Sequence, residues 1–592
     1  MVAMAAALAW AAAAGAAEPK VLRYALDASE TGFDPMKVND QYSRIINSHI
    51  FEAPYKYDYL ARPFKIKPNT AEGMPEVSAD FRSWTFHITP GIYFADDPVF
   101  KGKKRELVAA DYVYTWKRAY DPANKSPVYS TFNEEGVIGV DELRQQAIKT
   151  GKPFDYDREV EGVRALDRYT VQFKLAKPRP RFLYTLADQS PFGAVAREVI
   201  ERYGEQSAEH PVGTGPFRLS FWRRSSLMVL ERNPAFREIT YDAEPNADDA
   251  EGQALLARFK GRRLPMVDRV EVAVIEETQP RMLSFLNNEF DLLFKVPGDL
   301  IPVVAPGGIL APGLVRRGMA IQRIVSADIT YYFFNMEHPM VGGYTPDKVA
   351  LRRAFALAYD VDAEIRLVRR GQGVPAQTVV MPGTSGYDPQ LKTEGSEYSP
   401  ARARALLDMF GYVDRDGDGW RDMPDGSPLV LSLATLPDSI YRQFDELLKK
   451  NMDAINVRVE FKTAKFPEQL KAGRAGQLMM WSLGNTSSSP DFQESLQLLY
   501  GPASGGQNMS RFRLPAFDEL YERLQVLSDG PERNAILRQA QALVTAYAPH
   551  KYNVHRITSD IAQPWLIGFR RPPFGRQFWQ YVDIDDTKRD KR

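Results

Sequence analysis

The segment Pro211 to Phe217, PVGTGPF, places two prolines and two glycines within six residues. Glycine reaches backbone dihedrals that are closed to other residues, and proline fixes φ, so this segment must be a rigid, tight turn. A strand-like stretch begins at Phe217, and Asn233-Pro234 marks a further turn after the next predicted strands. The chain has 592 residues, too many for one core, so we expect two or three lobes with such turns between their elements.

Charge and composition narrow the range of partners. The sequence has 76 Lys and Arg against 76 Asp and Glu, a net charge of zero. A nucleic-acid or membrane-surface partner usually requires a basic excess, so we expect neither. A hydrophobic fraction of 44% is ordinary for a soluble globular protein. The many Tyr and Phe rings either fill a large core or line a ligand cleft.

We expect residues 1–17 to be a secretory signal peptide, because this stretch is apolar, short for a membrane span and ends in small residues. It lacks the basic start that such signals usually have. An N-terminal membrane anchor is the alternative. The sequence contains no cysteine, which excludes disulfides, thiol catalysis, Cys-ligated metals and a lipid-modified cysteine. An unanchored product needs an outer membrane to retain it, so we expect the periplasm of a two-membrane bacterium.

Alternation and helical periodicity predict a mixed α/β chain. The clearest predicted strands are 21–26, 83–88, 331–335 and 429–433, and the clearest predicted helices are 42–51, 109–118, 278–288, 351–360 and 400–411. The last helix has both start and stop signals: Ser399 can cap it, Pro400 is tolerated in its first turn and Gly411 ends it.

Four blocks in this order resemble the bacterial extracellular solute-binding proteins of family 5, which bind peptides and oligopeptides for ABC importers. The blocks are the helix around Asp111, Pro211–Phe217, the helix at 351–360 and the helix at 399–411. The resemblance extends over roughly residues 20 to 580. Family members usually have Thr three residues before the Asp, completing a capping box; Val108 stands there, so we expect a weaker or shifted cap.

The resemblance implies an α/β, periplasmic-binding-protein-like fold with two large lobes around a ligand cleft and a smaller inserted lobe. Lobe I would comprise 18–57, 210–300 and 550–592. The inserted lobe would be 58–209, and lobe II would be 301–549.

The resemblance also suggests how a ligand is held. Family members that bind peptides hold them as an added strand between the lobes, and an acidic residue shortly after a Trp pairs with the α-amine. Here Trp481 is present, but Gly484 stands in place of the acidic residue, followed by neutral Asn485. Asp491 either replaces it or simply begins a helix. The remaining candidate binding residues are Gly213, Thr214, Gly215 and Asn335.

The stretch Asp414 to Gly419 fits the first half of a calcium loop, with Asp414, Asp416 and Asp418 at alternate positions. Position 12 holds Asp425 where Glu is usual, and a strand is predicted to follow. The alternatives are an Asp/Gly turn and a structural calcium site. Calcium is the one cofactor that the sequence suggests.

Enzyme signatures are sparse. The six histidines form no H-E-x-x-H pattern, and neither a nucleophile elbow nor a phosphate-binding loop is present. We therefore expect no enzyme, and the resemblance implies a monomeric receptor that captures a solute, with a short peptide as the first candidate, and delivers it to an ABC permease and its ATPase. The alternatives are a modified peptide, sugar or cofactor-like ligand, a periplasmic chaperone or sensor and, least favoured, a secreted hydrolase.

Overall fold

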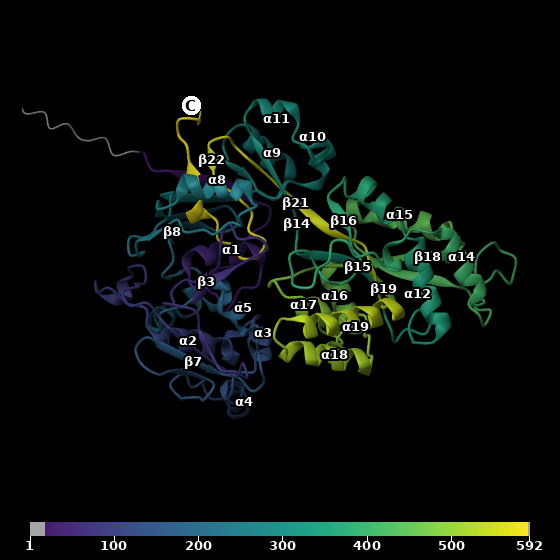
Figure 1. Ribbon diagram of the computed structural model, residues 1–592, viewed down its shortest axis with the longest axis horizontal. Coiled ribbons are helices and arrows are strands. Elements are labelled where there is room, and N and C mark those ends of the chain that lie inside the picture. Colours follow the sequence, from purple (N-terminus) through teal and green to yellow (C-terminus); the bar gives the residue numbers. More distant parts are fainter. Residues whose placement is uncertain (1–17, 590–592) are drawn as a thin grey trace, which may run out of the picture.

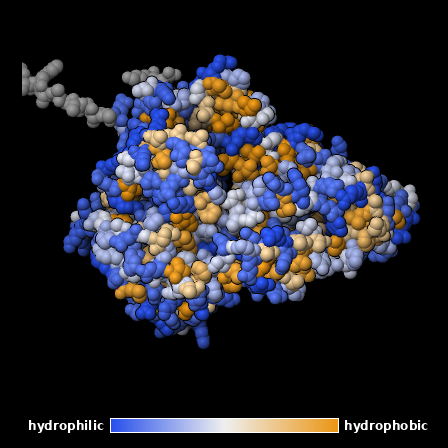
Figure 2. All heavy atoms as spheres, in the orientation of Figure 1, coloured by the Kyte–Doolittle hydropathy of each residue, from blue (hydrophilic) through white to orange (hydrophobic). Residues whose placement is uncertain are grey.

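The computed structural model describes residues 18–589, so the expected signal peptide lies outside the described residues. Two masses of helices and strands lie side by side, and long strands run from one to the other (Figure 1). Hydrophilic residues cover most of the face in Figure 2, with hydrophobic residues in scattered groups. Within the described range, no helix is long and apolar enough to cross a membrane.

Lobe I is built on a sheet with the strand order β14-β21-β13-β1-β12-β9-β8. Strand β1 (Val21–Leu26) lies parallel to β12 (Arg269–Val274) and β13 (Leu292–Leu293). Its inward residues Leu22, Tyr24 and Leu26 are fully buried. The other strands are β8 (Phe217–Arg223), β9 (Leu227–Arg232), β14 (Ala320–Val325) and β21 (Val554–Ala562), and the lobe carries helices α1 (Gln41–Ile50), α8 (Ala250–Phe259), α9 (Thr278–Leu286), α10 (Ile301–Val304) and α11 (Pro312–Arg316).

The inserted lobe has its own small antiparallel sheet and an aromatic core. The rings of Trp84, Trp116, Phe173 and Phe182 pack there in edge-to-face contacts. Its strands are β4 (Glu76–Val77), β5 (Ser83–His87), β6 (Val163–Ala165) and β7 (Thr170–Lys174), and its helices are α2 (Ala109–Arg118), α3 (Tyr129–Glu134), α4 (Val140–Thr150), α5 (Phe182–Leu186), α6 (Gln189–Phe192) and α7 (Arg197–Tyr203).

Lobe II packs helices on both faces of the sheet β18-β17-β19-β15-β20. Strand β15 (Asp328–Phe334) is buried along its whole length, with Tyr332 and Phe334 in one core and Tyr331 and Phe333 in the other. A strand covered on both faces gives the continuous apolar run seen in the sequence. The other strands are β17 (Val430–Thr435), β18 (Arg458–Thr463), β19 (Met480–Thr486) and β20 (His550–Tyr552), and the main helices are α12 (Pro346–Ala358), α14 (Pro400–Met409), α15 (Ser439–Asp453), α16 (Phe466–Arg474), α17 (Gln493–Gln497), α18 (Pro515–Val526) and α19 (Pro531–Tyr547).

Two neighbouring chain segments connect the lobes. Strand β14 pairs with β21 in the lobe I sheet, and two residues later β15 enters the lobe II sheet beside β20. Residues 301–325 pack with lobe I, since Val304, Leu310 and Met319 share a core with Phe285 and Ile561. The expected boundary at 300 therefore lies near residue 326, because the pairing partner of β14 is a strand from the far end of the chain.

The predicted start of α2 at Val108 agrees with the structure. Val108 has no side-chain cap, and the Asp111 carboxylate accepts the Val108 backbone N–H at 2.9 Å. The second half of the capping box is thus retained without its first half. At α14, by contrast, Ser399 occupies the cap position but its side chain accepts no capping hydrogen bond.

The PVGTGPF segment lies against the end of α1. A Cβ on Gly213 would lie 2.1 Å from the Ile50 carbonyl oxygen, and one on Gly215 would lie 2.6 Å from the same oxygen. The Gly215 N–H donates to that carbonyl at 2.8 Å, and the Gly213 carbonyl accepts from Ala95 at 2.9 Å. The Asn233 amide donates to the Gly215 carbonyl at 2.9 Å. The two turn signals of the sequence are therefore in direct contact, where the chain returns from the inserted lobe.

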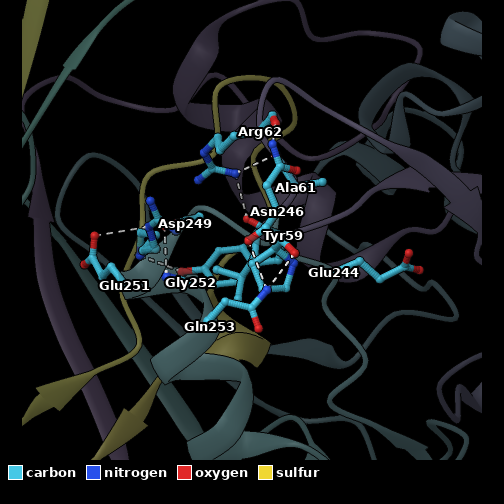
Figure 3. A network of polar contacts seen from close by, with 12 residues as sticks. Tyr59, Ala61, Arg62, Glu244, Asn246, Asp249, Glu251, Gly252 and Gln253 are labelled. Atoms are coloured by element: carbon cyan, nitrogen blue, oxygen red, sulfur yellow. Dashed lines mark hydrogen bonds and ion pairs between the residues drawn. The ribbon is translucent and has the colours of Figure 1, made fainter.

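The last part of the chain folds back onto lobe I through a polar network (Figure 3). Tyr59 donates its hydroxyl proton to the Gly568 carbonyl and accepts the Arg570 N–H. The Arg570 guanidinium pairs with Asp249, whose second oxygen accepts the Gly252 N–H at the start of α8. This network fixes the segment 568–576 beside the space between the lobes.

A first prediction concerns the close approach at Gly213. Because backbone surrounds this position, Gly213→Ala should lower the free energy of unfolding by about 1–3 kcal/mol, seen as a lower melting temperature by circular dichroism. Gly73→Ala is the matched control, since no atom lies within 4 Å of a Cβ there. Equal melting temperatures for the two variants would show that the contact can relax.

A second prediction concerns the buried pair between Asp34 of lobe I and Arg118 of α2. The Arg118 guanidinium donates twice to Asp34, at 2.9 and 2.6 Å, and both side chains are at most 1% exposed. Arg118→Met leaves a buried carboxylate without its cation and should cost about 3–5 kcal/mol in denaturant titrations. Asp34→Asn combined with Arg118→Met should cost much less.

The same pair has a pH dependence. Burial alone would raise the pKa of the Asp34 carboxyl, but the Arg118 charge and hydrogen bonds outweigh burial and lower it. A lowered folded-state pKa adds stability above the unfolded value of about 4, and this stability is lost as the pH falls through the folded value. The stability gap between the wild type and the double variant should therefore narrow below about pH 4. A gap that is constant with pH would contradict this assignment.

Candidate functional site

A cavity of about 430 Å³, here called the hinge cavity, lies between the lobes. Its walls are the end of β14, the start of β15 at Asp328, the end of β19 at Thr486, the middle of β21 and the segment 571–576. These are the crossing segments themselves together with one edge from each large lobe. A change in the angle between the lobes would therefore change the shape of this cavity.

The hinge cavity is strongly cationic. Its ionisable lining groups are Lys295, Arg556, Arg571 and Arg576 against a single carboxylate, Asp328. Asp328 accepts the Arg556 backbone N–H and Nε–H, both at 2.8 Å, and is therefore already paired. Burial raises the pKa of Asp328, and the Arg556 charge only partly offsets this.

A second cavity of about 170 Å³, the junction cavity, lies where all three lobes meet. It is lined by Tyr57 of lobe I, Glu135 and Arg181 of the inserted lobe, and Asp491 of lobe II. Arg576 lines both the junction cavity and the hinge cavity and so connects them.

Asp491, the expected substitute for the missing acidic residue, already has cationic partners. Its carboxylate accepts two hydrogen bonds from the Arg533 guanidinium, at 2.7 and 2.8 Å, and lies 3.7 Å from Arg181. Burial opposes its ionisation, yet these two cations lower the pKa of Asp491. Asp491 is therefore already paired with cations from lobe II and from the inserted lobe, and its capture of a ligand amine stays a prediction.

Arg181 connects the inserted lobe to lobe II. Its guanidinium donates to the carbonyls of Leu524, Gln525 and Leu527 at 2.6–2.8 Å. These carbonyls lie at the C-terminal end of α18, where the helix dipole favours a cation. Gln497 of lobe II likewise donates to Glu134 of the inserted lobe at 2.9 Å. The two lobes are therefore in polar contact across the junction cavity.

Strand β19 places the predicted Trp481 region at the cleft. It pairs with β15 along its length but with β17 only at Met480 and Trp481, so Ser482 to Thr486 have no strand on their second side in the described sheets. Trp481 itself is a core residue, 1% exposed. Gly484 and Asn485 follow on the same strand, opposite Thr330 and Ile329.

A third, smaller cavity of about 120 Å³, the strand cavity, lies beside this edge. Trp481, Gly484 and Arg556 line it together with Asp445 of α15. Burial raises the pKa of the Asp445 carboxyl to about 6, and a hydrogen bond from Thr435 partly opposes the shift. A Cβ on Gly484 would be 3.5 Å from Nη2 of Arg556, an ordinary contact.

The other predicted binding residues lie in packed positions outside these three cavities. Thr214 is 1% exposed, and its hydroxyl donates to Glu52 at 3.0 Å. Gly213 and Gly215 lie against α1, as described above. The Asn335 amide donates to the carbonyls of Gly476 and Leu478, and its oxygen accepts the Glu337 N–H. Their polar groups hold the fold together.

Sequence reasoning did not find the cations of the cleft. Lys295 follows β13, Arg556 lies on β21, and Arg571 and Arg576 frame the loop Arg571-Pro-Pro-Phe-Gly-Arg576. The concentration of arginines around two prolines was the one available signal. Nothing local indicates that these segments share a cavity.

The predicted calcium loop is a turn in which Asp oxygens accept backbone N–H groups. Asp414 accepts from Gly417 and Gly419, and Asp416 accepts from Asp418. Asp418 pairs with Arg458. The carboxylates that converge are those of Asp414, Asp416 and Asp422, with Asp422 in place of the expected Asp418. Within residues 18–589 this is the one group of three or more acidic, His or Cys side chains close enough to hold a metal ion.

A third prediction follows from this geometry. Since both Asp414 oxygens accept backbone N–H groups, we expect the melting temperature to be unchanged by millimolar calcium and by a chelator. A rise with calcium that the chelator reverses, and that Asp416→Asn abolishes, would establish a bound ion instead.

Known proteins resemble this chain in fold and in sequence. The family described as bacterial extracellular solute-binding proteins, family 5 Middle, matches residues 65–507. Di/tripeptide-binding protein 2 of Pseudomonas aeruginosa is 24% identical over 97% of both chains, and the dipeptide-binding protein of Escherichia coli is 23% identical over 97% of this chain and 96% of its own. The periplasmic binding protein DppA of Helicobacter pylori, solved with the peptide STSA, superposes with a TM-score of 0.69 at 20% identity, covering 95% of this chain and 98% of its own. The chain belongs to the bacterial extracellular solute-binding proteins of family 5.

Proposed function

We propose that this protein is the periplasmic substrate-binding component of an ABC importer and that it captures short peptides or peptide-like solutes between its lobes. The relatives named for dipeptides and tripeptides support this substrate class, as they align over nearly their whole length. The solute would be bound by the chain alone and then delivered to a permease and its ATPase.

The observation that carries the proposal is the unpartnered edge of β19 at the inter-lobe cavities. Residues Ser482 to Thr486 have no neighbouring strand on one side; Ser482 to Gly484 line the strand cavity and Thr486 lines the hinge cavity. An extended peptide can bind such an edge through main-chain hydrogen bonds, which tolerate many side chains. The aromatic and aliphatic groups lining the strand cavity, such as Tyr441, Phe444 and Leu483, would then receive one ligand side chain.

Capture would proceed by closure about the paired crossings. Two short segments connecting two rigid lobes are the arrangement in which hinge motion occurs, because few dihedrals must change. Contacts such as Arg181 with the end of α18 form only when the inserted lobe and lobe II approach each other. A ligand bridging the lobes would favour this closed arrangement.

One end of lobe I offers a surface for a protein partner. Leu283, Val303, Ile309 and Val315 are each more than half exposed, and they belong to α9, α10, the turn after it and α11. Figure 2 shows hydrophobic residues gathered over these helices. An exposed apolar group of this kind marks an interaction surface, and we assign it to the permease.

Two buried histidines, His550 of β20 and His555 of β21, lie on the crossing strands. Burial lowers the pKa of His550 to about 3 and that of His555 to about 4, so both rings are neutral at physiological pH. The His555 ring is 2.6 Å from the Asp328 carbonyl and helps to connect the two crossings.

A fourth prediction tests the proposed function. Native mass spectrometry of the full mature protein purified from cells should show a co-purified adduct with the mass of a short peptide or peptide derivative. After removal of this adduct by partial unfolding and refolding, pools of two- to five-residue peptides should restore an adduct and raise the melting temperature. If no peptide pool, free or derivatised, does so, the peptide proposal is wrong.

A further inference from the structure

The hinge cavity has an excess of positive charge that the protein does not neutralise. Asp328 pairs with Arg556, and Asp560 pairs with Arg571 at 2.5 and 2.6 Å. These two pairs leave Lys295 and Arg576. The Lys295 ammonium donates to the neutral Gln41 side chain at 2.9 Å and lies over the Tyr42 ring, and no carboxylate among the described residues is within ion-pair distance of it.

Of the two cations, Arg576 has the fewer polar partners among the described residues. In the described part of the chain its guanidinium makes no hydrogen bond and no ion pair, although the side chain is half-buried at the meeting point of the hinge and junction cavities. Burial, together with the nearby charge of Arg44, lowers the pKa of Arg576 to about 10. Arginine remains charged at physiological pH, so this group carries a desolvation cost that an anion in the cavity would offset.

Lys295 also has an unusual backbone. Its φ of 53° lies in the left-handed region, which non-glycine residues adopt at an energetic cost. The Lys295 N–H donates to Asp560 at 2.8 Å, so the strained conformation is held by the same carboxylate that orients Arg571. Asp560 therefore holds the Lys295 backbone and the Arg571 side chain on one side of the cavity.

Beside Gly484, on the β19 side of the site, the charged group is the Arg556 guanidinium. A ligand ammonium bound there would need a carboxylate. Arg556 lines both the hinge and strand cavities and is 3.5 Å from the position of a Cβ on Gly484. A ligand ammonium near Gly484 would therefore meet the Arg556–Asp328 ion pair, in which the carboxylate is already used, and no carboxylate on β19. Asp445 is the one unpaired carboxylate lining the strand cavity, and it is the rival partner for an amine.

We propose that the site selects an anionic, amine-blocked peptide-like solute, such as an N-acylated peptide carrying an additional carboxylate, and discriminates against peptides with a free α-amine. This inference rests on the proposed function, in that the ligand lies along β19 between the lobes. Arg576 and Lys295 bind the anionic group in the hinge cavity, and the edge at Gly484, where Arg556 already occupies the Asp328 carboxylate, offers an ammonium no free partner.

A matched set of ligands tests the inference directly. One pool of lysine-free peptides of two to five residues is used free, N-acetylated or N-succinylated, so that the amino end is positive, neutral or negative. Binding to the mature, ligand-stripped protein is measured by native mass spectrometry and titration calorimetry. We expect affinity to rise from free to acetylated to succinylated, with at least about a tenfold difference between the extremes.

Variants test which residues cause the preference for succinylated peptides. Arg576→Gln and Lys295→Gln should each weaken binding of the succinylated pool about tenfold to a hundredfold, with little change for the acetylated pool. Gly484→Asp, which introduces a carboxylate beside Arg556, should reduce the ratio of succinylated to free affinity about tenfold. Arg538→Gln, which removes an exposed arginine on α19, is the matched control for charge. Circular dichroism checks the folding of each variant, and Lys295→Gln carries the test if Arg576→Gln does not fold.

The outcomes separate this inference from the proposed function. If free peptides bind as tightly as succinylated ones, or more tightly, charge selection is wrong while peptide binding stands. If Asp445→Asn abolishes tight binding of free peptides, Asp445 is the amine partner and the inference is overturned in the same way. If none of the three pools binds, both this inference and the peptide proposal fail.

Discussion

The paired crossing between the two large lobes is the constraint on which the rest of the structure depends. Strands β14 and β21 are antiparallel partners in one sheet, and their continuations β15 and β20 are partners in the other. Asp328 and Arg556 connect the two segments at the crossing, and the Ser326 N–H donates to the Arg556 carbonyl at 2.8 Å. Because both crossings are paired, the lobes can change their mutual angle without losing register, and the cavity has a floor that belongs to both lobes.

The smaller lobe is held by contacts of a different kind. Where the chain returns from this lobe, Gly213 and Gly215 let the backbone approach α1 more closely than any side chain allows. Asp34 of lobe I and Arg118 of α2 form a second, buried contact between the lobes. A buried ion pair is weak evidence for net stability, because desolvation offsets the attraction. Its geometric effect is clearer, since misplacing the lobe would leave a buried charge without a partner. The inserted lobe is thereby held in a fixed position relative to lobe I, with Arg181 facing lobe II.

Local charge and overall charge differ sharply in this protein. The whole chain is neutral, whereas the hinge cavity holds two cations, Lys295 and Arg576, without carboxylate partners in the described structure. In a cleft with low-dielectric walls, such groups dominate the field that a ligand meets. The neutral composition argues against a polyanionic macromolecule as a partner, but it carries no information about the electrostatic field inside the cleft.

The sequence by itself determined the elements whose signals are local: β1, α2, the buried strand β15, helix α14 with its start and stop residues, and the tight turn at Pro211–Phe217. These elements also identified the family. Only the tertiary structure decided the boundary near residue 326, the pairing of Asp491 with Arg533 and the grouping of Lys295, Gly484, Arg556 and Arg576 around one space. The physical reason is range. Helical and strand periodicity depends on neighbours within a few residues, whereas the field of a cleft depends on side chains hundreds of residues apart that strand pairing brings together.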